Sequence, residues 1–234
     1  MTPFLHTPIF EFQLFEIIVV IFCGLVFGSF ASAITYRVPL GLPWATKGKS
    51  EHGLRSACPS CKTKLKARDL IPIFSWLSSK GKCRHCNTPI SKTYPVCEAL
   101  TLLGCIGIYC VYGLTPFAIP FYLMIPFLIA LMMIDLKYMI LPNQLVAIIF
   151  TLGFIAVFLR MMSIESSQTT SLFVIYFGGA IAYGLFSWGL GALMEKILKK
   201  EALGFGDVKF FTAAGIWLGL PAIGQFCIGA GAIG

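Results

Sequence analysis

Acidic residues are scarce in this chain. Only 10 of its 234 residues are Asp or Glu, and aspartate occurs just at positions 69, 135 and 207. Charged residues of both signs make up 12% of the chain and hydrophobic residues 57%, with a mean hydropathy of +0.84. A soluble protein of this length needs more polar side chains to cover its surface. The composition therefore excludes an ordinary soluble domain and indicates an integral membrane protein.

Three widespread catalytic motifs are also missing. The sequence contains no H-E-x-x-H, no G-x-S-x-G and no phosphate-binding glycine loop. Each motif positions the reactive groups of one enzyme class. Their absence argues against a zinc metalloprotease, a serine hydrolase and a nucleoside triphosphatase.

Long apolar runs predict the architecture. A segment of about 20 apolar residues crosses the ~30 Å hydrocarbon core of a bilayer as a helix. Such segments occur near residues 14–36, 95–113, 116–135, 144–162 and 171–194. A sixth run begins at Asp207 and is interrupted at 219–221, and the residues beyond it are expected to enter a further span. The expected fold is an all-α polytopic membrane protein with about six to eight transmembrane helices.

The first apolar run carries small residues at every fourth position. Gly24, Gly28 and Ser32 would form a stripe along one side of a helix. Small side chains let a second helix approach closely, so this stripe predicts a helix-packing surface.

Basic residues set the expected orientation. Twelve of the 18 Lys and Arg residues lie in the polar segment 37–94, and others follow the third and fifth apolar runs, at Lys137 and Lys196. Because Lys and Arg favour the cytoplasmic side, a single topology places all these loops in the cytoplasm. The formal charge of +8 is therefore explained by topology, and nucleic acid is not an expected partner.

Four cysteines in the polar segment predict a metal site. Cys58-x-x-Cys61 and Cys83-x-x-Cys86 are separated by 21 residues. Two such pairs supply four thiolates for tetrahedral zinc, which would be structural because no position is left open. A redox dithiol is the alternative, which a reducing cytoplasm and the doubled motif disfavour. His85, inside the second pair, could replace one of the thiolates, but we interpret it as a solvated side chain.

Two of the three aspartates are expected at the same membrane face. Asp135 ends the third apolar run and Asp207 opens the sixth. Carboxylates at the edge of membrane segments are costly, and they usually face a bundle interior or a wet cavity. Two facing carboxylates do not ionise together easily, so one can accept a proton from water while the other donates to a carbonyl oxygen. The pair predicts aspartic peptide hydrolysis, which needs no metal.

Other interpretations of these aspartates stay open. Each could be an interface residue paired with Lys137 or Lys209. The two could also relay protons in a proton-coupled membrane transporter. Carriers of that kind favour midplane carboxylates and repeated halves, whereas both aspartates are expected at one face and no clear internal repeat is found.

Glycines surround the last aspartate. Gly204 and Gly206 lack a Cβ, so the chain can take positive φ angles there and another backbone can approach Asp207 closely. An extended peptide beside the carboxylate would need that room.

These motifs resemble a known family. GFGD at 204–207 with DLKYMILPN at 135–143 is similar to the GxGD class of aspartic proteases. GLVFGSFASAITYRVP at 24–39, the cysteine-containing segment 58–100 and GFGDVKFFTAAGIWLG at 204–219 resemble the bacterial type IV prepilin peptidases, in the family's order. The resemblance covers about residues 14–220. Ser32 departs from the family, which commonly has Asn there; we expect altered helix contacts and unchanged chemistry.

The resemblance implies a domain organisation for the chain. Residues 1–36 would hold the N-terminal region and the first transmembrane helix, 37–94 a cytoplasmic zinc-binding domain, and 95–234 the transmembrane aspartic protease domain. Its implied site residues are catalytic Asp135 and Asp207, substrate-positioning Gly204, Gly206 and Lys209, and the metal ligands Cys58, Cys61, Cys83 and Cys86.

The resemblance also implies the reaction and its location. The enzyme would sit in the bacterial inner membrane, among lipid, with its active site facing the cytoplasm. It would remove the basic leader peptide of type IV prepilins or type II secretion pseudopilins, cutting after a glycine and before the apolar helix. Some members also N-methylate the new N-terminus, using S-adenosylmethionine. The sequence has no recognisable S-adenosylmethionine fingerprint, so that second activity rests on the resemblance alone.

Overall fold

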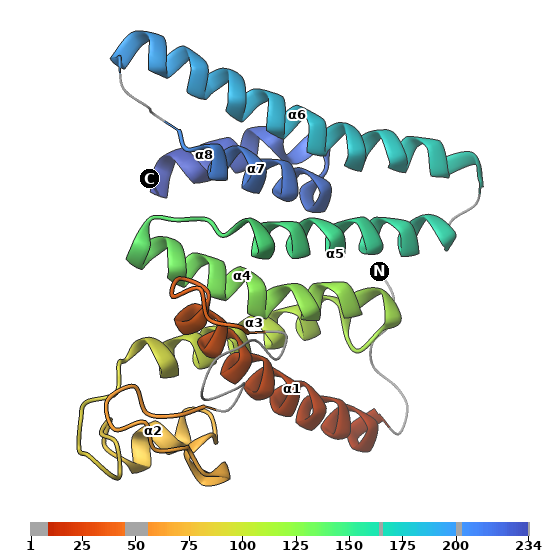
Figure 1. Ribbon diagram of the computed structural model, residues 1–234. Helices are drawn as coiled ribbons and strands as arrows, with labels where there is room; N and C mark the ends of the chain where they lie inside the picture. The colour runs from red at the N-terminus through yellow and green to blue at the C-terminus, as the bar shows by residue number, and fades with distance from the viewer. Residues whose placement is uncertain (1–8, 45–55, 164–165, 200–202, 234) are drawn as a thin grey trace. The chain divides into compact units, whose positions relative to one another are not determined.

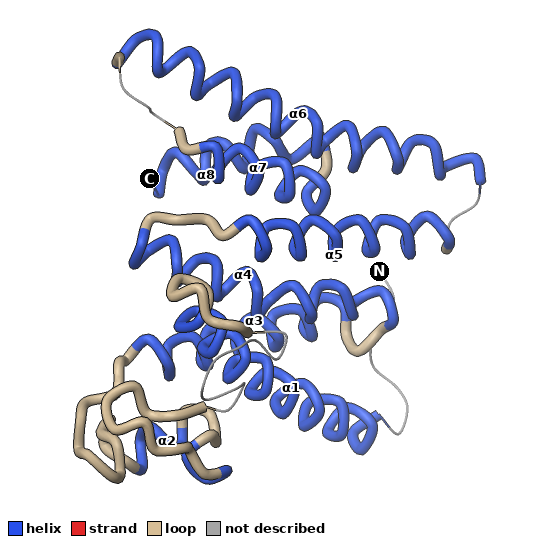
Figure 2. Tube along the Cα trace, viewed as in Figure 1, coloured by secondary structure: helices blue, strands red, loops and turns tan. Residues whose placement is uncertain are grey.

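The computed structural model describes residues 9–44, 56–163, 166–199 and 203–233. This part of the chain is helical and contains no β-strand (Figures 1 and 2). Its α-helices are α1 (Ile9–Arg37), α2 (Phe74–Ser78), α3 (Thr93–Tyr112), α4 (Ile119–Tyr138), α5 (Asn143–Met162), α6 (Ser166–Leu198), α7 (Phe205–Leu218) and α8 (Ile223–Ile233). Short 3₁₀ turns are η1 (Ala67–Asp69), η2 (Pro116–Ala118) and η3 (Leu220–Ala222).

Five of the described helices are long and apolar enough to cross a membrane: α1, α3, α4 with the preceding η2, α5 and α6. They match the five complete apolar runs, which confirms an all-α polytopic membrane protein. The interrupted sixth run becomes α7 and α8, which are bent by 119° and form either a broken span or a re-entrant loop. At this bend Gly219 adopts a φ of 73°, a conformation that side chains rarely allow, and Pro221 follows in η3. The described spans therefore number five, or six with the bent pair.

The chain divides into two compact units, Met1–Met133 and Ile134–Gly234, and the boundary falls within α4. Each unit is described by itself.

In the first unit, α1 and α3 pack together through the small-residue stripe. A Cβ on Gly28 would lie 2.7 Å from the Glu98 Cα, and one on Gly24 would lie 2.9 Å from the Leu102 Cδ1. Ser32 is also buried, and its hydroxyl donates to a carbonyl oxygen one turn earlier in α1. The stripe is a helix-packing surface, as predicted, because a larger side chain at Gly28 would collide with backbone.

The cysteine-containing segment is attached to the beginning of α3. The Ile73 backbone N–H donates to the Glu98 carboxylate at 2.6 Å. Ile73 has a φ of 62°, a rare conformation for a β-branched residue. Glu98 is buried, so this hydrogen bond satisfies a carboxylate that would otherwise be costly within the span.

In the second unit, α7 packs against both α5 and α6 (Figure 1). Gly215 of α7 and Gly179 of α6 bring the two backbones together, since a Cβ on Gly215 would lie 2.6 Å from the Gly179 carbonyl oxygen. On the other side, the Trp217 indole N–H donates to the Ile149 carbonyl oxygen of α5 at 2.9 Å. A buried cluster around Ile216 fills the space between them. These contacts fix the C-terminal half of α7 against α5 and α6.

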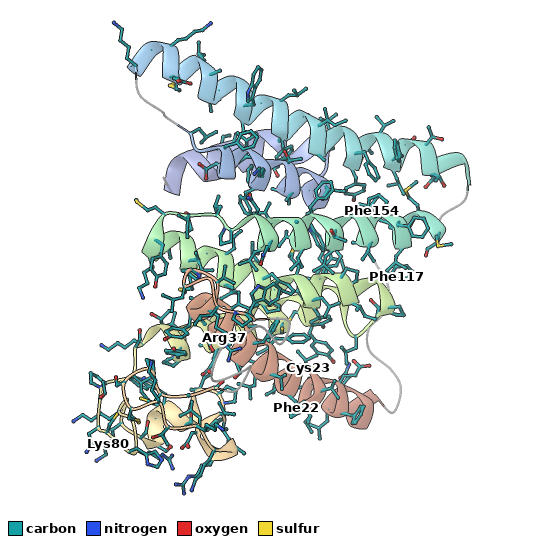
Figure 3. The ribbon with its side chains drawn as sticks, viewed as in Figure 1. Phe22, Cys23, Arg37, Lys80, Phe117 and Phe154 are labelled. Carbon is teal, nitrogen blue, oxygen red and sulfur yellow. The ribbon has the colours of Figure 1, made fainter. Side chains whose placement is uncertain are left out.

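Large apolar side chains remain exposed along the spans. Phe22, Phe117 and Phe154 have 67%, 47% and 46% of their surface exposed, and Figure 3 shows them among the side chains along the helices. In water such surfaces would aggregate, whereas hydrocarbon solvates them. This distribution is that of helices surrounded by lipid.

Candidate active site and metal centre

A cleft of about 640 Å³ lies within the second unit. Three segments line it: the end of α4 with the loop that follows, the first residue of α5, and the turn that starts α7. Its lining residues are Asp135, Leu136, Met139, Ile140, Leu141, Asn143, Gly204, Phe205, Gly206, Asp207 and Lys209. The structure therefore brings both predicted aspartates to one cleft, together with all three residues predicted to position substrate.

Asp207 is the third residue of α7, and its carboxylate caps that helix. It accepts a hydrogen bond from the Gly204 N–H at 3.0 Å, while its own N–H donates to the Gly204 carbonyl oxygen at 3.0 Å. The N-terminus of a helix carries partial positive charge and unpaired N–H groups. The carboxylate is thereby held in one orientation at the start of α7.

Asp135 lies in the last turn of α4 and is exposed to the cleft. Its carbonyl oxygen accepts the Met139 N–H at 2.8 Å, and Met139 has a φ of 53°. This left-handed residue ends the helix directly after Tyr138 and turns the chain towards α5. Asp135 and the turn that follows it both line the second unit's cleft.

The two glycines matter here through their missing Cβ atoms, because neither uses the positive φ that glycine permits. Gly204 has a φ of −68°, and Gly206 is helical without a positive φ. A Cβ on Gly204 would lie 3.2 Å from the Asp207 Oδ2, and one on Gly206 would lie 3.2 Å from the Leu141 Cβ. Both contacts are tight, so larger residues would crowd the carboxylate or the facing loop.

Lys209 is held by its neighbours instead of extending freely. Its Nζ donates to the Asn143 Oδ1 at 2.8 Å and lies 4.7 Å from the centre of the Phe205 ring. Sequence reasoning missed Asn143. Its place directly after the Leu-Pro that precedes the fourth apolar run was the available signal, because polar residues at helix starts often line sites.

The four predicted cysteines come together in the first unit. The Sγ atoms of Cys58, Cys61, Cys83 and Cys86 all lie within 4.8 Å of one another. His85 is not part of this group. Four thiols at this spacing, two of them buried, fit a tetrahedral ion such as zinc, and they leave no position for substrate.

The two cysteine pairs are built in the same way. The Cys58 N–H donates to the Thr63 carbonyl oxygen at 3.0 Å, and the Cys83 N–H donates to the Thr88 carbonyl oxygen at 2.9 Å. Each loop also has one residue in the left-handed region, Lys62 or Asn87. Such loops turn backbone N–H groups towards the sulfur atoms, which is how small metal-binding loops stabilise thiolates.

Hydrogen bonds prepare two of the thiols for ionisation. The Cys86 Sγ lies 3.2 Å from the Thr88 hydroxyl oxygen, and this hydroxyl together with the Thr88 backbone N–H lowers the pKa of Cys86 to about 6. Thr63 acts on Cys61 in the same way and lowers its pKa. Thiolates are the form that binds metal, so the chemistry of this donor set fits zinc.

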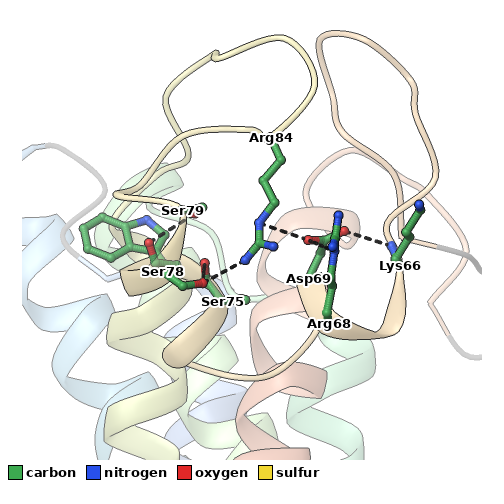
Figure 4. Close-up of polar contacts among 8 residues, drawn as sticks. Lys66, Arg68, Asp69, Ser75, Ser78, Ser79 and Arg84 are labelled. Carbon is green, nitrogen blue, oxygen red and sulfur yellow. Dashed lines mark hydrogen bonds and ion pairs between the residues drawn. The ribbon is translucent and has the colours of Figure 1, made fainter.

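The third aspartate connects the two halves of the cysteine-containing segment (Figure 4). The Asp69 carboxylate accepts the Lys66 N–H at 3.1 Å and pairs with Arg68 at 3.9 Å and with Arg84 at 3.4 Å. Arg84 also donates to the Ser78 hydroxyl at 2.8 Å. These contacts give Asp69 a structural role within the cysteine-containing segment.

Comparison with known proteins covers nearly the whole chain. The model of the Bacterial Peptidase A24 N-terminal domain matches residues 22–112, and that of the Type IV leader peptidase family matches 122–234. The chain is 33% identical over 207 residues to a type 4 prepilin-like proteins leader peptide-processing enzyme of Escherichia coli O78:H11, covering 84% of this chain and 74% of that protein.

Further relatives carry a two-part name. Proteins named prepilin leader peptidase/N-methyltransferase are 31% identical in Pectobacterium carotovorum and 32% identical in Aeromonas hydrophila. Each alignment covers 86% of this chain, and 74% and 72% of the respective relative. No solved structure matches the chain significantly. From these matches and the geometry above, this chain belongs to the bacterial type IV prepilin leader peptidase family.

Proposed function

We propose that this protein is a membrane aspartic endopeptidase that removes the basic leader peptide from type IV prepilins or type II secretion pseudopilins. One observation carries the proposal. Two of the chain's three aspartates line a single cleft, whereas the third is ion-paired in the cysteine-containing segment. The names of the relatives support leader peptides as the substrate class.

In the proposed mechanism, Asp135 and Asp207 share one proton. The ionised aspartate accepts a proton from the attacking water while the protonated one donates to the carbonyl oxygen of the scissile peptide bond. The proton taken from water then passes to the leaving nitrogen, the C–N bond breaks, and a hydroxyl of the tetrahedral intermediate returns a proton to the other aspartate. Gly204 and Gly206 leave room for the substrate backbone beside Asp207.

The location follows from charge. The cleft is formed by the cytoplasmic ends of the spans if the basic segment 37–94 and the loop carrying Lys137 face the cytoplasm. We therefore propose an inner-membrane enzyme that meets the substrate leader on the cytoplasmic side. Lipid would surround the exposed apolar faces of the spans.

Zinc is proposed for the four-cysteine cluster. Cys58, Cys61, Cys83 and Cys86 would hold the ion, and its contribution there would be to fold the segment. The four thiols fill a tetrahedral site and leave no position open for substrate, so we assign the metal no chemical step.

A second activity is proposed from the relatives. Their name includes N-methyltransferase, which implies S-adenosylmethionine as the methyl donor. We assign no residue of this chain to that reaction. A proton-coupled transporter is not favoured, because family membership and the placement of the aspartates support a peptidase.

The testing experiment is cleavage of a prepilin by the purified protein in detergent, read as leader removal on a gel, with product mass reporting methylation. Asp135→Asn and Asp207→Asn should each abolish cleavage, because asparagine cannot exchange the proton, and the double variant should be no worse. Asp69→Asn is the control and should retain cleavage. Activity lost in Asp69→Asn but kept in Asp135→Asn would contradict the assignment. A transporter would instead show proton flux in liposomes and no cleavage.

A further inference from the structure

The contact between α5 and α7 at the cleft fixes the orientation of an amide. Lys209 Nζ lies 2.8 Å from the Asn143 side chain. An ammonium group has donors only, so the atom that faces it must be the amide oxygen. This removes the usual ambiguity between the oxygen and nitrogen of an asparagine, which are otherwise assigned from their surroundings. The Asn143 nitrogen therefore points away from Lys209.

That nitrogen is available to a ligand. Within the described residues, the Asn143 Oδ1 has Lys209 as its partner and the Nδ2 has none. Asn143 is exposed and lines the same cleft as Asp135 and Asp207. Its two N–H donors are uncharged, and they neither titrate nor depend on the proton shared by the aspartates.

The lysine also changes what the amide can do. A positive charge on the oxygen side of a carboxamide withdraws electron density, which makes its N–H groups better donors. Lys209 is itself steadied by the Phe205 ring, 4.7 Å from its Nζ. Lys209 thus directs one N–H at Asn143, which suits it to orient this amide.

We propose that Asn143 is a substrate-binding residue that donates its amide N–H to a backbone carbonyl oxygen of the peptide in the cleft, and that Lys209 is a positioning residue that orients this amide. The proposal rests on the proposed peptidase function. It identifies the extended backbone of the substrate, and not its basic side chains, as what this part of the cleft recognises. Such a donor supports the substrate carbonyl while charge develops on it.

Two variants of Asn143 separate its role as an N–H donor to substrate from its role as the hydrogen-bond acceptor for Lys209. Asn143→Asp keeps an oxygen for Lys209 but removes the N–H donors, and Asn143→Leu removes both at similar size. Both should lower kcat/KM for prepilin cleavage by about 10- to 100-fold, the range between an ordinary hydrogen bond and an oxyanion donor. Each variant is measured across pH and compared at its own optimum, because the added carboxylate shifts the protonation of the aspartates. Asn143→Gln, which keeps the amide on a longer stem, should recover part of the loss.

Lys209→Met tests the positioning role. Alone it should lower kcat/KM by about 3- to 10-fold, since the amide remains but is free to rotate. Added to Asn143→Leu it should cause no further loss, because the lysine would act only through the asparagine. Wild-type kcat/KM in Asn143→Asp at its own optimum would overturn the donor role. An additional loss from Lys209→Met in the Asn143→Leu background would overturn the positioning role. Either result leaves the peptidase proposal standing if Asp135→Asn is inactive in the same assay.

Discussion

The closest helix contact in the first unit offers a direct test of its packing. Gly28 in α1 faces the backbone of Glu98 in α3, and an added Cβ would lie 2.7 Å from its Cα and 3.0 Å from its carbonyl oxygen. Non-bonded carbon atoms are comfortable at about 3.5–4.0 Å, so α1 and α3 must separate by roughly 1 Å in Gly28→Ala. Overpacking of this kind typically costs about 1–3 kcal/mol. Alanine recovers up to about 1 kcal/mol of helix propensity, so the net loss of stability should be about 1–2 kcal/mol.

Gly107→Ala is the matched control, because Gly107 also lies in a span and an added Cβ there would meet nothing within 4 Å. It should leave the free energy of unfolding unchanged or raise it by up to about 1 kcal/mol. Both variants are unfolded by heat in the same detergent while circular dichroism follows helix content. A lower midpoint for Gly28→Ala than for Gly107→Ala is expected. Equal midpoints would refute the inference that backbone contact at Gly28 sets the distance between α1 and α3.

Three further predictions concern the cleft and the cysteines. Gly206→Ala should lower the rate of leader cleavage by about tenfold or more, because the added Cβ would press on Leu141 in the cleft wall. In the control Gly189→Ala the added Cβ meets nothing within 4 Å, so this variant should cleave normally. Equal cleavage rates in the two variants would contradict this role of Gly206. Elemental analysis of protein purified without chelator should find about one zinc per chain, and Cys61→Ser should lower thermal stability more than it slows cleavage; absence of zinc would exclude the assigned metal. In metal-free protein at neutral pH, iodoacetamide should modify Cys86 before Cys83, because Cys86 is exposed and Thr88 lowers its pKa to about 6, whereas Cys83 is buried. Peptide mass spectrometry would measure both modifications. Equal rates of modification at the two cysteines would contradict the thiolate assignment.

The helices could be predicted because their signal is local. The apolar runs gave five spans whose ends agree with the structure within a few residues, and the small-residue stripe correctly identified the packing face of α1. Both patterns depend on hydrophobicity and side-chain size along one helix. Neither requires knowledge of which distant residue lies opposite.

The candidate site was predicted less completely, because part of it depends on distant partners. The shared cleft of Asp135 and Asp207 followed from topology, since both were placed at one membrane face. Asn143 is joined to Lys209 across 66 residues, and no local pattern indicates that pairing. The sequence also does not show how Gly204 is used: glycine permits a positive φ without requiring it, and here the chain uses only the missing Cβ.

The same logic applies to Glu98. A glutamate near the start of a span was visible in the sequence, but its partner, the backbone N–H of Ile73, lies in a loop with an irregular conformation. Almost every residue has a backbone N–H, so the sequence does not show which of these donors will bind a given side chain. The structure was needed to show how this carboxylate is satisfied.

The matching cysteine loops have a consequence for the unfolded chain. A metal held by both pairs ties Cys61 to Cys83 and closes a loop of 21 intervening residues. By the relation used for covalent cross-links, closing such a loop removes conformational entropy worth roughly 3 kcal/mol from the unfolded chain. Because each loop supplies only two ligands, loss of any one sulfur weakens the link between the halves as a whole. The ion would therefore serve this segment as a reversible counterpart of a disulfide, usable in a compartment where disulfides are reduced.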